Sequence, residues 1–155
     1  MHGYGASMYD LVDIAPIIND TDYIYIFPNA PIEIDVGFEN KGYAWFPIET
    51  DDISASDKLL NLTIKEALAM FKFNEEKLFI GGFSQGGDVA ITTLTRSTQN
   101  YPLAGCIALS TWFPGEGTQA AISKPSKKLE TPVLQCHGES DEMIRREPVS
   151  YTHLT

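Results

Sequence analysis

The chain has 155 residues, enough for one domain with a buried core. Its formal net charge is −10, with 21 Asp and Glu against 11 Lys and Arg. This imbalance argues against binding nucleic-acid phosphates or docking on an anionic membrane, since both need clustered basic side chains.

The histidines and cysteines do not have the spacing of a metal site. His2, His137 and His153 are isolated from one another, so we expect neither a metal nor a cofactor. Cys106 and Cys136 lie in apolar, strand-like runs and are predicted to be buried, reduced thiols. No apolar run is long enough to cross a bilayer and no signal peptide is visible, so we expect a cytoplasmic protein.

The first half of the chain predicts a loop, a strand and a helix. Residues 1–5 are typical of a loop that follows a buried strand, and residues 23–27 (YIYIF) predict a strand that ends at a proline-rich loop. Residues 51–73 predict a helix, with Ser54, Ser56 and Asp57 as possible caps. Its apolar residues recur at helical spacing and form one face: Leu60, Ile64, Ala67, Leu68 and Phe71.

The second half alternates between apolar strands and a helix. Residues 77–81, 103–110 and 132–136 predict strands, and residues 85–98 predict a helix. Strands that are apolar throughout and separated by helices indicate an α/β fold with a mostly parallel sheet covered on both faces. In such sheets the chemistry lies at the carboxyl ends of the strands.

A G-x-S-x-G motif follows the strand at 77–81. Ser84 stands between Gly82 and Gly86, at the point where the strand turns sharply into the next helix. We expect the turn to strain the serine backbone, and the glycines to be required because side chains there would collide with neighbouring backbone. The helix start would aim the N–H of Gln85 at a developing oxyanion, so Ser84 is the candidate nucleophile.

An acidic loop follows the last predicted strand. A serine nucleophile needs a base and an orienting carboxylate. In α/β enzymes with a G-x-S-x-G turn between a strand and a helix, called a nucleophile elbow, these residues come in the chain order serine, acid, histidine. Residues 137–142 (HGESDE) offer Glu139, Asp141 and Glu142, and spacing alone does not choose among them.

Four ordered segments resemble the phospholipase/carboxylesterase family of α/β-hydrolases, which includes the acyl-protein thioesterases. Residues 2–5 (HGYG) are similar to its H-G-x-G loop, and residues 27–31 (FPNAP) with 44–46 (AWF) are similar to two further segments. Residues 81–87 (GGFSQGG) look like its nucleophile elbow, and residues 132–141 resemble its acid loop.

The resemblance implies an incomplete α/β-hydrolase fold and a role for individual residues. Ser84 matches the nucleophile, Asp141 matches the acid, and the backbone N–H groups of Tyr4 and Gln85 match the oxyanion hole. Trp45 matches an aromatic residue near the substrate pocket, although core packing is an equal alternative. It further implies that His2 shapes the oxyanion loop, and His137 is expected to be a structural hydrogen-bonding residue; neither is expected to be the base.

The chain departs from the family pattern at both ends. Only His153 follows Asp141, without the strand expected before the family's histidine, and residues 148–155 do not resemble the family. We therefore expect a partial hydrolase domain over residues 1–147, truncated at both ends, and a non-family tail over 148–155.

Two functions remain open at this stage. The first is a serine hydrolase that cleaves carboxylic esters or thioesters of a small molecule or an acylated protein through an acyl-serine intermediate. The alternative is a catalytically inert or binding domain that lacks the triad histidine.

Overall fold

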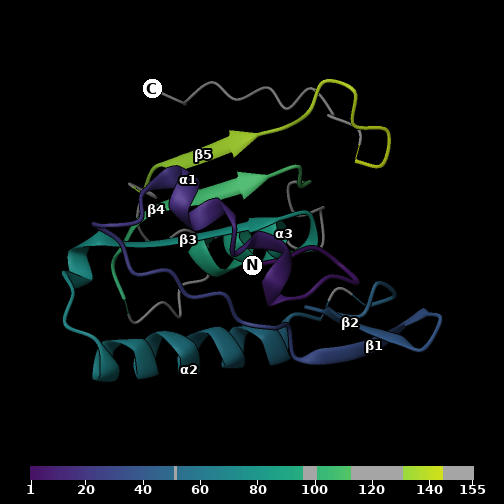
Figure 1. Ribbon diagram of the computed structural model, residues 1–155, viewed down its shortest axis with the longest axis horizontal. Coiled ribbons are helices and arrows are strands. Elements are labelled where there is room, and N and C mark those ends of the chain that lie inside the picture. The colour runs from purple at the N-terminus through teal and green to yellow at the C-terminus, as the bar shows by residue number, and fades with distance from the viewer. Residues whose placement is uncertain (51, 96–100, 113–130, 145–155) are drawn as a thin grey trace.

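A three-stranded parallel sheet lies at the centre of the molecule (Figure 1). The computed structural model describes residues 1–50, 52–95, 101–112 and 131–144. The strand order is β3 (Leu78–Phe83), β4 (Leu103–Leu109) and β5 (Val133–Cys136). The three predicted strands of the second half are thus confirmed, together with their parallel arrangement.

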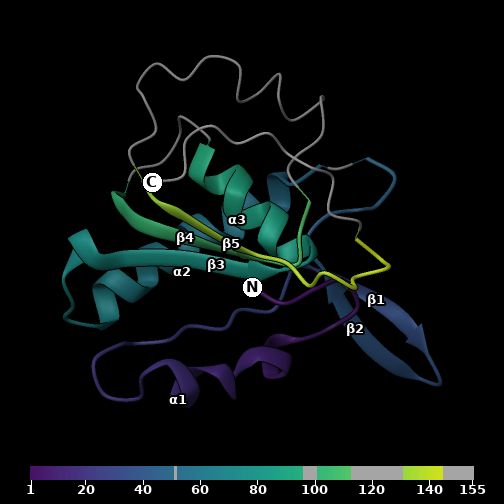
Figure 2. The same ribbon diagram turned by 90° about the horizontal axis from the view of Figure 1, so that it is seen from above.

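Helices lie on both sides of this sheet. Helix α3 (Gln85–Thr95) packs on β3 and β4, while the short helix α1 (Ile14–Ile18) lies on the opposite side of the sheet (Figure 2). The long helix α2 (Ser54–Met70) confirms the predicted helix with tighter bounds. Two short 3₁₀ helices, η1 (Met8–Leu11) and η2 (Glu75–Lys77), precede α1 and β3.

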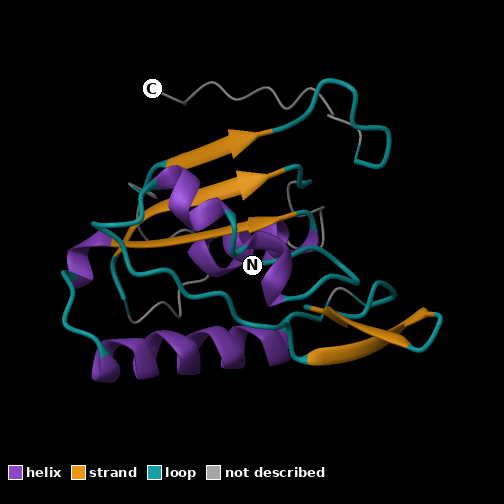
Figure 3. Ribbon diagram, in the orientation of Figure 1, coloured by secondary structure: helices purple, strands orange, loops and turns teal. Residues whose placement is uncertain are grey.

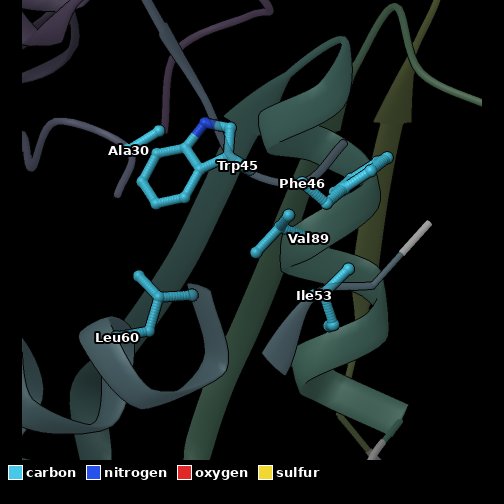
Figure 4. Packing of buried hydrophobic residues seen from close by; sticks show 6 residues of the cluster. All are labelled: Ala30, Trp45, Phe46, Ile53, Leu60 and Val89. Atoms are coloured by element: carbon cyan, nitrogen blue, oxygen red, sulfur yellow. The ribbon is translucent and has the colours of Figure 1, made fainter. Parts of the chain in front are cut away.

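The buried core divides into two clusters around α3. One joins α3 to the sheet through Ala90, Ile91, Leu94, Cys106 and Ala108. The other joins α3 to α2 through the segment after β2 (Figure 4), and consists of Ala30, Trp45, Phe46, Ile53, Leu60 and Val89. Because α3 contributes to both, the helix that follows Ser84 is fixed from two directions.

The expectation that both faces of the sheet are covered is only half right. Cys106 and Ala108 on the α3 side are buried, but Phe79 is 47% exposed and Leu134 is 58% exposed. The opposite face borders a cavity of about 540 Å³ between the sheet, α1 and α2. Its lining is mainly apolar and includes Ile14, Ile24, Leu60, Phe79 and Ile107.

The two cysteines differ because successive side chains of a strand point to opposite faces. Cys106 is buried against α3, and burial raises the pKa of its thiol to about 11. Cys136 is exposed, so the prediction that it is buried was wrong. Both thiols are free, as expected.

The strand predicted at residues 23–27 is wrong. The rings of Tyr23 and Tyr25, and those of Tyr25 and Phe27, lie 6.1 and 6.2 Å apart, which fits the alternation of an extended segment. No described residue pairs with this segment in a ladder, and a strand is defined by that pairing rather than by its side chains. The segment lines the cavity instead.

An antiparallel hairpin was missed by the sequence analysis. It joins β1 (Ile32–Gly37) and β2 (Asn40–Ala44), and it projects away from the sheet (Figure 3). The signal was present as alternation of Ile32, Ile34 and Val36 with acidic residues. The turn residues Phe38 and Glu39 have φ values of 53° and 60°, without the glycine that favours such turns.

The first residues of the chain pair with the edge of the sheet. The amino group of Met1 donates to the carbonyl of Gly81 at 2.7 Å, and the N–H of Phe83 donates to the carbonyl of Met1 at 3.0 Å. Residue 1 therefore lies beside β3 like the last residue of a neighbouring strand, and residues 2–5 form the loop that was predicted to follow such a strand.

Two further expectations concern the helix cap and the end of the domain. The N-cap residue of α2 is Ile53, so no side chain caps the helix there. Ser56, one of the predicted caps, instead donates its hydroxyl to the carbonyl of Trp45. The predicted end of the domain at 147 and the tail at 148–155 fall outside the described residues. No described helix is long and apolar enough to cross a membrane.

Candidate active site

Ser84 occupies a strained turn between β3 and α3. Its φ is 54°, in the left-handed region that side chains other than glycine rarely adopt. The backbone is fixed on both sides: the N–H of Ser84 donates to the carbonyl of Leu109 at 2.9 Å, and its carbonyl accepts from Gly87 at 2.9 Å. The predicted sharp bend at this position is confirmed.

The glycines around Ser84 are required by close backbone contacts. A Cβ at Gly82 would overlap the backbone of Gly86, and one at Gly86 would lie 2.5 Å from the carbonyl oxygens of Met1 and His2. These positions cannot carry a side chain unless the elbow opens. The predicted reason for the motif, collision with neighbouring backbone, is thus confirmed.

The loop formed by residues 2–5 lies against Ser84. A Cβ on Gly3 would lie 3.5 Å from the Cβ of Ser84, so Gly3 lies directly against the Ser84 turn. Tyr4 is the next residue of the loop. Gly5 has a φ of 77°, and its N–H donates to the carbonyl of Tyr43 at 3.0 Å, which fixes the loop on β2.

The N–H groups of Tyr4 and Gln85 form no hydrogen bond within the described part of the chain. Gln85 is the first residue of α3, where the helix leaves its N–H groups unpaired. Unpaired amide N–H groups beside a serine can stabilise an oxyanion by donating hydrogen bonds to it. The positive end of the α3 dipole points to the same place and adds to this stabilisation.

A buried network supports this loop from behind. His2 is 1% exposed; its Nδ1 lies 2.8 Å from the carbonyl of Gly3, and its Nε2 accepts from the N–H of Ala30 at 3.1 Å. Because a backbone N–H can only donate, Nε2 carries no proton and Nδ1 does. Burial is the main cause that lowers the pKa of His2, so the ring is held neutral. These contacts fit a residue that shapes the loop and not a base.

Trp45 belongs to the core and not to an open pocket. Its side chain is 0% exposed, and its Nε1 donates to the carbonyl of His2 at 2.8 Å. Of the two expected roles, substrate-pocket residue and core packing, this burial favours core packing (Figure 4). Through its indole N–H, Trp45 holds the loop formed by residues 2–5 in place.

Asp141 is the most constrained of the three candidate acids. Its Oδ1 accepts from the N–H groups of Met143 at 3.1 Å and Ile144 at 2.9 Å, whereas Glu139 and Glu142 are exposed. The bond from Ile144 is the largest cause that lowers the pKa of Asp141. The residue therefore stays ionised, as an orienting carboxylate must.

The ring of the second histidine near the site, His137, is also engaged in a structural hydrogen bond. His137 Nε2 lies 2.6 Å from the carbonyl of Ile144 and 3.5 Å from Asp141 Oδ2. Because a carbonyl oxygen can only accept, Nε2 is the protonated nitrogen. This contact fits the expected structural role. His153, the third histidine, lies outside the described residues.

The sheet brings the elbow and the acid loop to the same edge. Phe83 is paired with Leu109, and Leu109 with Cys136, so Ser84, Ser110 and His137 follow three adjacent strands at their carboxyl ends. Parallel strands present their carboxyl ends together, which is why three separate sequence segments converge here.

Two residues at this edge were missed by the sequence analysis. Ser110 has a φ of 41° and donates its N–H to the carbonyl of Cys136 at 2.8 Å. Asp88, in the first turn of α3, accepts from Trp112 Nε1 at 3.1 Å and from Thr92 Oγ1 at 3.2 Å. Nothing in the sequence pattern marks Ser110, but an acid within an apolar helix was a usable signal for Asp88.

The described residues hold no group of three or more His, Cys, Asp or Glu side chains that could bind a metal ion. The geometry thus offers a strained serine, two unpaired amides and an ionised acid, which are the parts used for acyl transfer.

The chain is similar to known hydrolases over nearly its whole length. The phospholipase/carboxylesterase family model matches residues 1–153. The chain is 31% identical to acyl-protein thioesterase 1 of Mycosarcoma maydis, over 95% of this chain and 69% of that protein. It is 30% identical to acyl-protein thioesterase 1 homolog 1 of Dictyostelium discoideum, over 99% of this chain and 73% of that protein.

Solved structures show the same fold. The crystal structure of esterase PE8 superposes with a TM-score of 0.69 at 28% identity, covering 92% of this chain and 68% of that one. Arabidopsis thaliana SOBER1 superposes with a TM-score of 0.67 at 24% identity, covering 90% of this chain and 71% of that one. With its α/β-hydrolase fold and its elbow, the chain belongs to the phospholipase/carboxylesterase family of hydrolases.

Proposed function

We propose that the chain cleaves carboxylic esters or thioesters through an acyl intermediate on Ser84. The observation that carries the proposal is the left-handed elbow at Ser84 beside two unpaired amide N–H groups. In this mechanism the Ser84 hydroxyl attacks the acyl carbon, and the N–H groups of Tyr4 and Gln85 stabilise the resulting oxyanion. Asp141 would orient an imidazole that accepts the serine proton and passes it to the departing alcohol or thiol, and water would then release the acyl group from Ser84.

The substrate class follows from the relatives. Those in Mycosarcoma maydis and Dictyostelium discoideum are named as acyl-protein thioesterases, which favours an S-acylated protein or a small acyl ester or thioester as substrate. A cytoplasmic location is part of the same proposal, supported by two free cysteines.

Labelling with a fluorophosphonate probe tests the nucleophile. We expect the probe to modify Ser84 in the full chain, and the label to disappear in the Ser84→Ala variant. Ser140→Ala is the control, because Ser140 is an exposed serine of the acid loop and its loss should leave labelling unchanged. Turnover of an acyl thioester and its oxygen ester would then identify the preferred leaving group.

The competing proposal is an inert hydrolase-fold domain. It is favoured by one observation: the two described histidines, His2 and His137, use their ring nitrogens in structural contacts. Without a base, Ser84 would be a weak nucleophile, and the oxyanion hole alone supplies only a small part of the rate. A folded sample that resists the probe would support this alternative and contradict the first.

A further inference from the structure

The outer edge of β3 carries the beginning of a further parallel ladder. β3 is the first strand of the sheet, and β4 is its only partner among the described strands. On the other side, Met1 donates its amino group to the carbonyl of Gly81 at 2.7 Å and accepts the N–H of Phe83 at 3.0 Å. One residue bonded in this way to both neighbours of Gly82 is the hydrogen-bond pattern of parallel strands. Met1 therefore defines the direction and register of a strand at this edge.

The rest of the β3 edge has no described strand beside it. Backbone groups of successive strand residues point to opposite sides of the strand. The N–H of Gly81 and both backbone groups of Phe79 therefore point the same way as the Gly81 carbonyl that binds Met1. No strand lies there within the described ranges. Such a row of N–H and C=O groups is a template for pairing with another chain.

The cavity of about 540 Å³ borders this edge. Residues 77–82 line it on one side, and residues 22–28, which run along β3 (Figure 1), line it on the other. Helix α1 lines it from one face of the sheet, and α2, which packs on α3, lines it from the other (Figure 2). A segment in this position would be covered on both faces, and parallel strands covered in this way are apolar throughout.

The apolar side chains of the cavity are only partly covered. Ile24 is 50% exposed, Ile26 is 45% exposed and Phe79 is 47% exposed, although all three line a cavity between packed elements. Covering apolar surface of this kind favours binding, because it removes that surface from water. The cavity thus supplies the apolar contacts, and the β3 edge supplies the backbone hydrogen bonds.

The amino group of Met1 indicates which end of a chain fits here. Burial lowers its pKa from the usual 8.0 to about 6. An ammonium has three donors, and the carbonyl of Gly81 is the one acceptor that the described residues offer it. A peptide that runs parallel to β3 would bring its carboxyl end to this amino group. A free carboxylate there would supply both acceptors and the opposite charge.

We propose that the β3 edge and the cavity beside it bind the extended, apolar carboxyl-terminal end of a polypeptide as a further parallel strand. The bound segment pairs its backbone with Phe79 and Gly81 and places its carboxylate against the amino group of Met1. In strand addition of this kind, main-chain hydrogen bonds give affinity and side-chain pockets give specificity. The proposal does not depend on the reaction proposed for Ser84.

Fluorescence anisotropy of a dye-labelled peptide tests the proposal on the full chain at pH 7. The peptide KKGVIVV has a free carboxyl end, and its lysines keep it soluble. We expect saturable binding. KKGVPVV, in which proline removes a ladder N–H, should bind about tenfold more weakly or worse. The carboxamide form of KKGVIVV should also bind more weakly, because it lacks the charge. Absence of saturable binding, or equal binding of the proline peptide, would overturn the proposal.

Two substitutions on α2 provide a matched pair. Ile64 lines the cavity, whereas Leu62 is 50% exposed and lies outside the lining. Ile64→Arg should weaken binding of KKGVIVV by about tenfold or more, because a charge enters an apolar site. Leu62→Arg should leave the affinity unchanged, and equal affinities of the two variants would contradict the proposed site. If Ile64→Arg does not fold, the peptide series on the wild type still decides.

Amide hydrogen exchange locates the bound peptide. The N–H groups of Phe79 and Gly81 should become protected in the complex, whereas that of Ile80, which points towards β4, should not change. The amino group of Met1 should titrate at a higher pH, because a nearby carboxylate favours its charged form. Binding without protection of Phe79 and Gly81 would mean apolar contact alone and would overturn the added strand. Protection of both amides in a free protein with the mass of a dimer would assign the edge to a second copy, which also overturns the proposal.

Discussion

The backbone of Trp45 is held by the side chain of Gln85, the residue that follows the candidate nucleophile. The N–H of Trp45 donates to Gln85 Oε1 at 2.8 Å, and Gln85 Nε2 donates to the carbonyl of Phe46 at 2.8 Å. Gln85 is 2% exposed, so one buried amide joins α3 to the segment after β2. Its backbone N–H remains available at the elbow.

Replacing this amide should destabilise the fold. Gln85→Met keeps the size of the side chain but leaves two buried backbone groups without partners, at about 1–3 kcal/mol each. We expect the free energy of unfolding to fall by about 3 kcal/mol in urea titrations. Gln135→Met, at a half-buried position on β5, is the control and should change stability by about 0.5 kcal/mol or less. Equal effects of the two substitutions would contradict the role of Gln85.

The two glycines Gly82 and Gly138 should respond very differently to alanine. At Gly82 the new methyl group would overlap the backbone of Gly86, whereas at Gly138 the nearest atom would be 3.9 Å away. Overpacking of this kind destabilises by about 3 kcal/mol when backbone must move. We expect Gly82→Ala to lower the melting temperature strongly and Gly138→Ala to leave it close to the wild type. A tolerated Gly82→Ala would mean that the elbow is less tightly closed.

The strain at Ser84 predicts that glycine stabilises this position. Ser84→Gly and Ser84→Ala both remove the hydroxyl and should both abolish probe labelling. Only glycine relieves the left-handed φ of 54°, which disfavours other residues by about 1–2 kcal/mol. Chemical denaturation should therefore show Ser84→Gly to be more stable than Ser84→Ala by about 1 kcal/mol. The reverse order would argue against a strained elbow.

Stability should fall as the pH is lowered from 8 towards 6. Burial lowers the pKa of the Met1 amino group from its usual 8.0 to about 6, and it also lowers the pKa of His2 below its usual 6.5. The unfolded chain thus binds more protons than the folded chain in this range, so folding is favoured at the higher pH and weakened by acid.

Acetylation of the amino terminus checks the contribution of Met1. It removes the titrating group, and the dependence of unfolding free energy on pH between 8 and 6.5 should become flatter. His2 should add a further loss only below its usual pKa. If the acetylated and free proteins lose stability in parallel over this interval, the buried amino group is not the cause.

The sequence predicts those features that depend on residues close to one another along the chain. The elbow was predictable because Gly82, Ser84 and Gly86 follow an apolar strand and precede a helix, all within a short segment. The three strands of the sheet were predictable for the same reason, since each forms a short apolar run.

Features that depend on distant partners were not predictable. Residues 23–27 have the composition of a strand, but strand formation requires a neighbour that composition does not reveal. Trp45 matched a pocket residue and proved to be buried, because its exposure depends on packing against α2 and α3. The left-handed φ of Ser110 lies where the chain is hydrogen-bonded to distant segments, through its own N–H to Cys136 and through the carbonyl of Leu109 to Ser84, and it leaves no mark in the local sequence.

The hydrogen bond between Asp88 and Trp112 joins α3, the helix that follows Ser84, to the segment that follows β4. The N–H of Asp88 also donates to the carbonyl of Ser84 at 3.2 Å, so the same residue touches both the elbow and the indole. Asp88 therefore joins the Ser84 turn, through its backbone N–H, to the segment after β4, through its carboxylate, so the placement of both segments depends on the same first turn of α3.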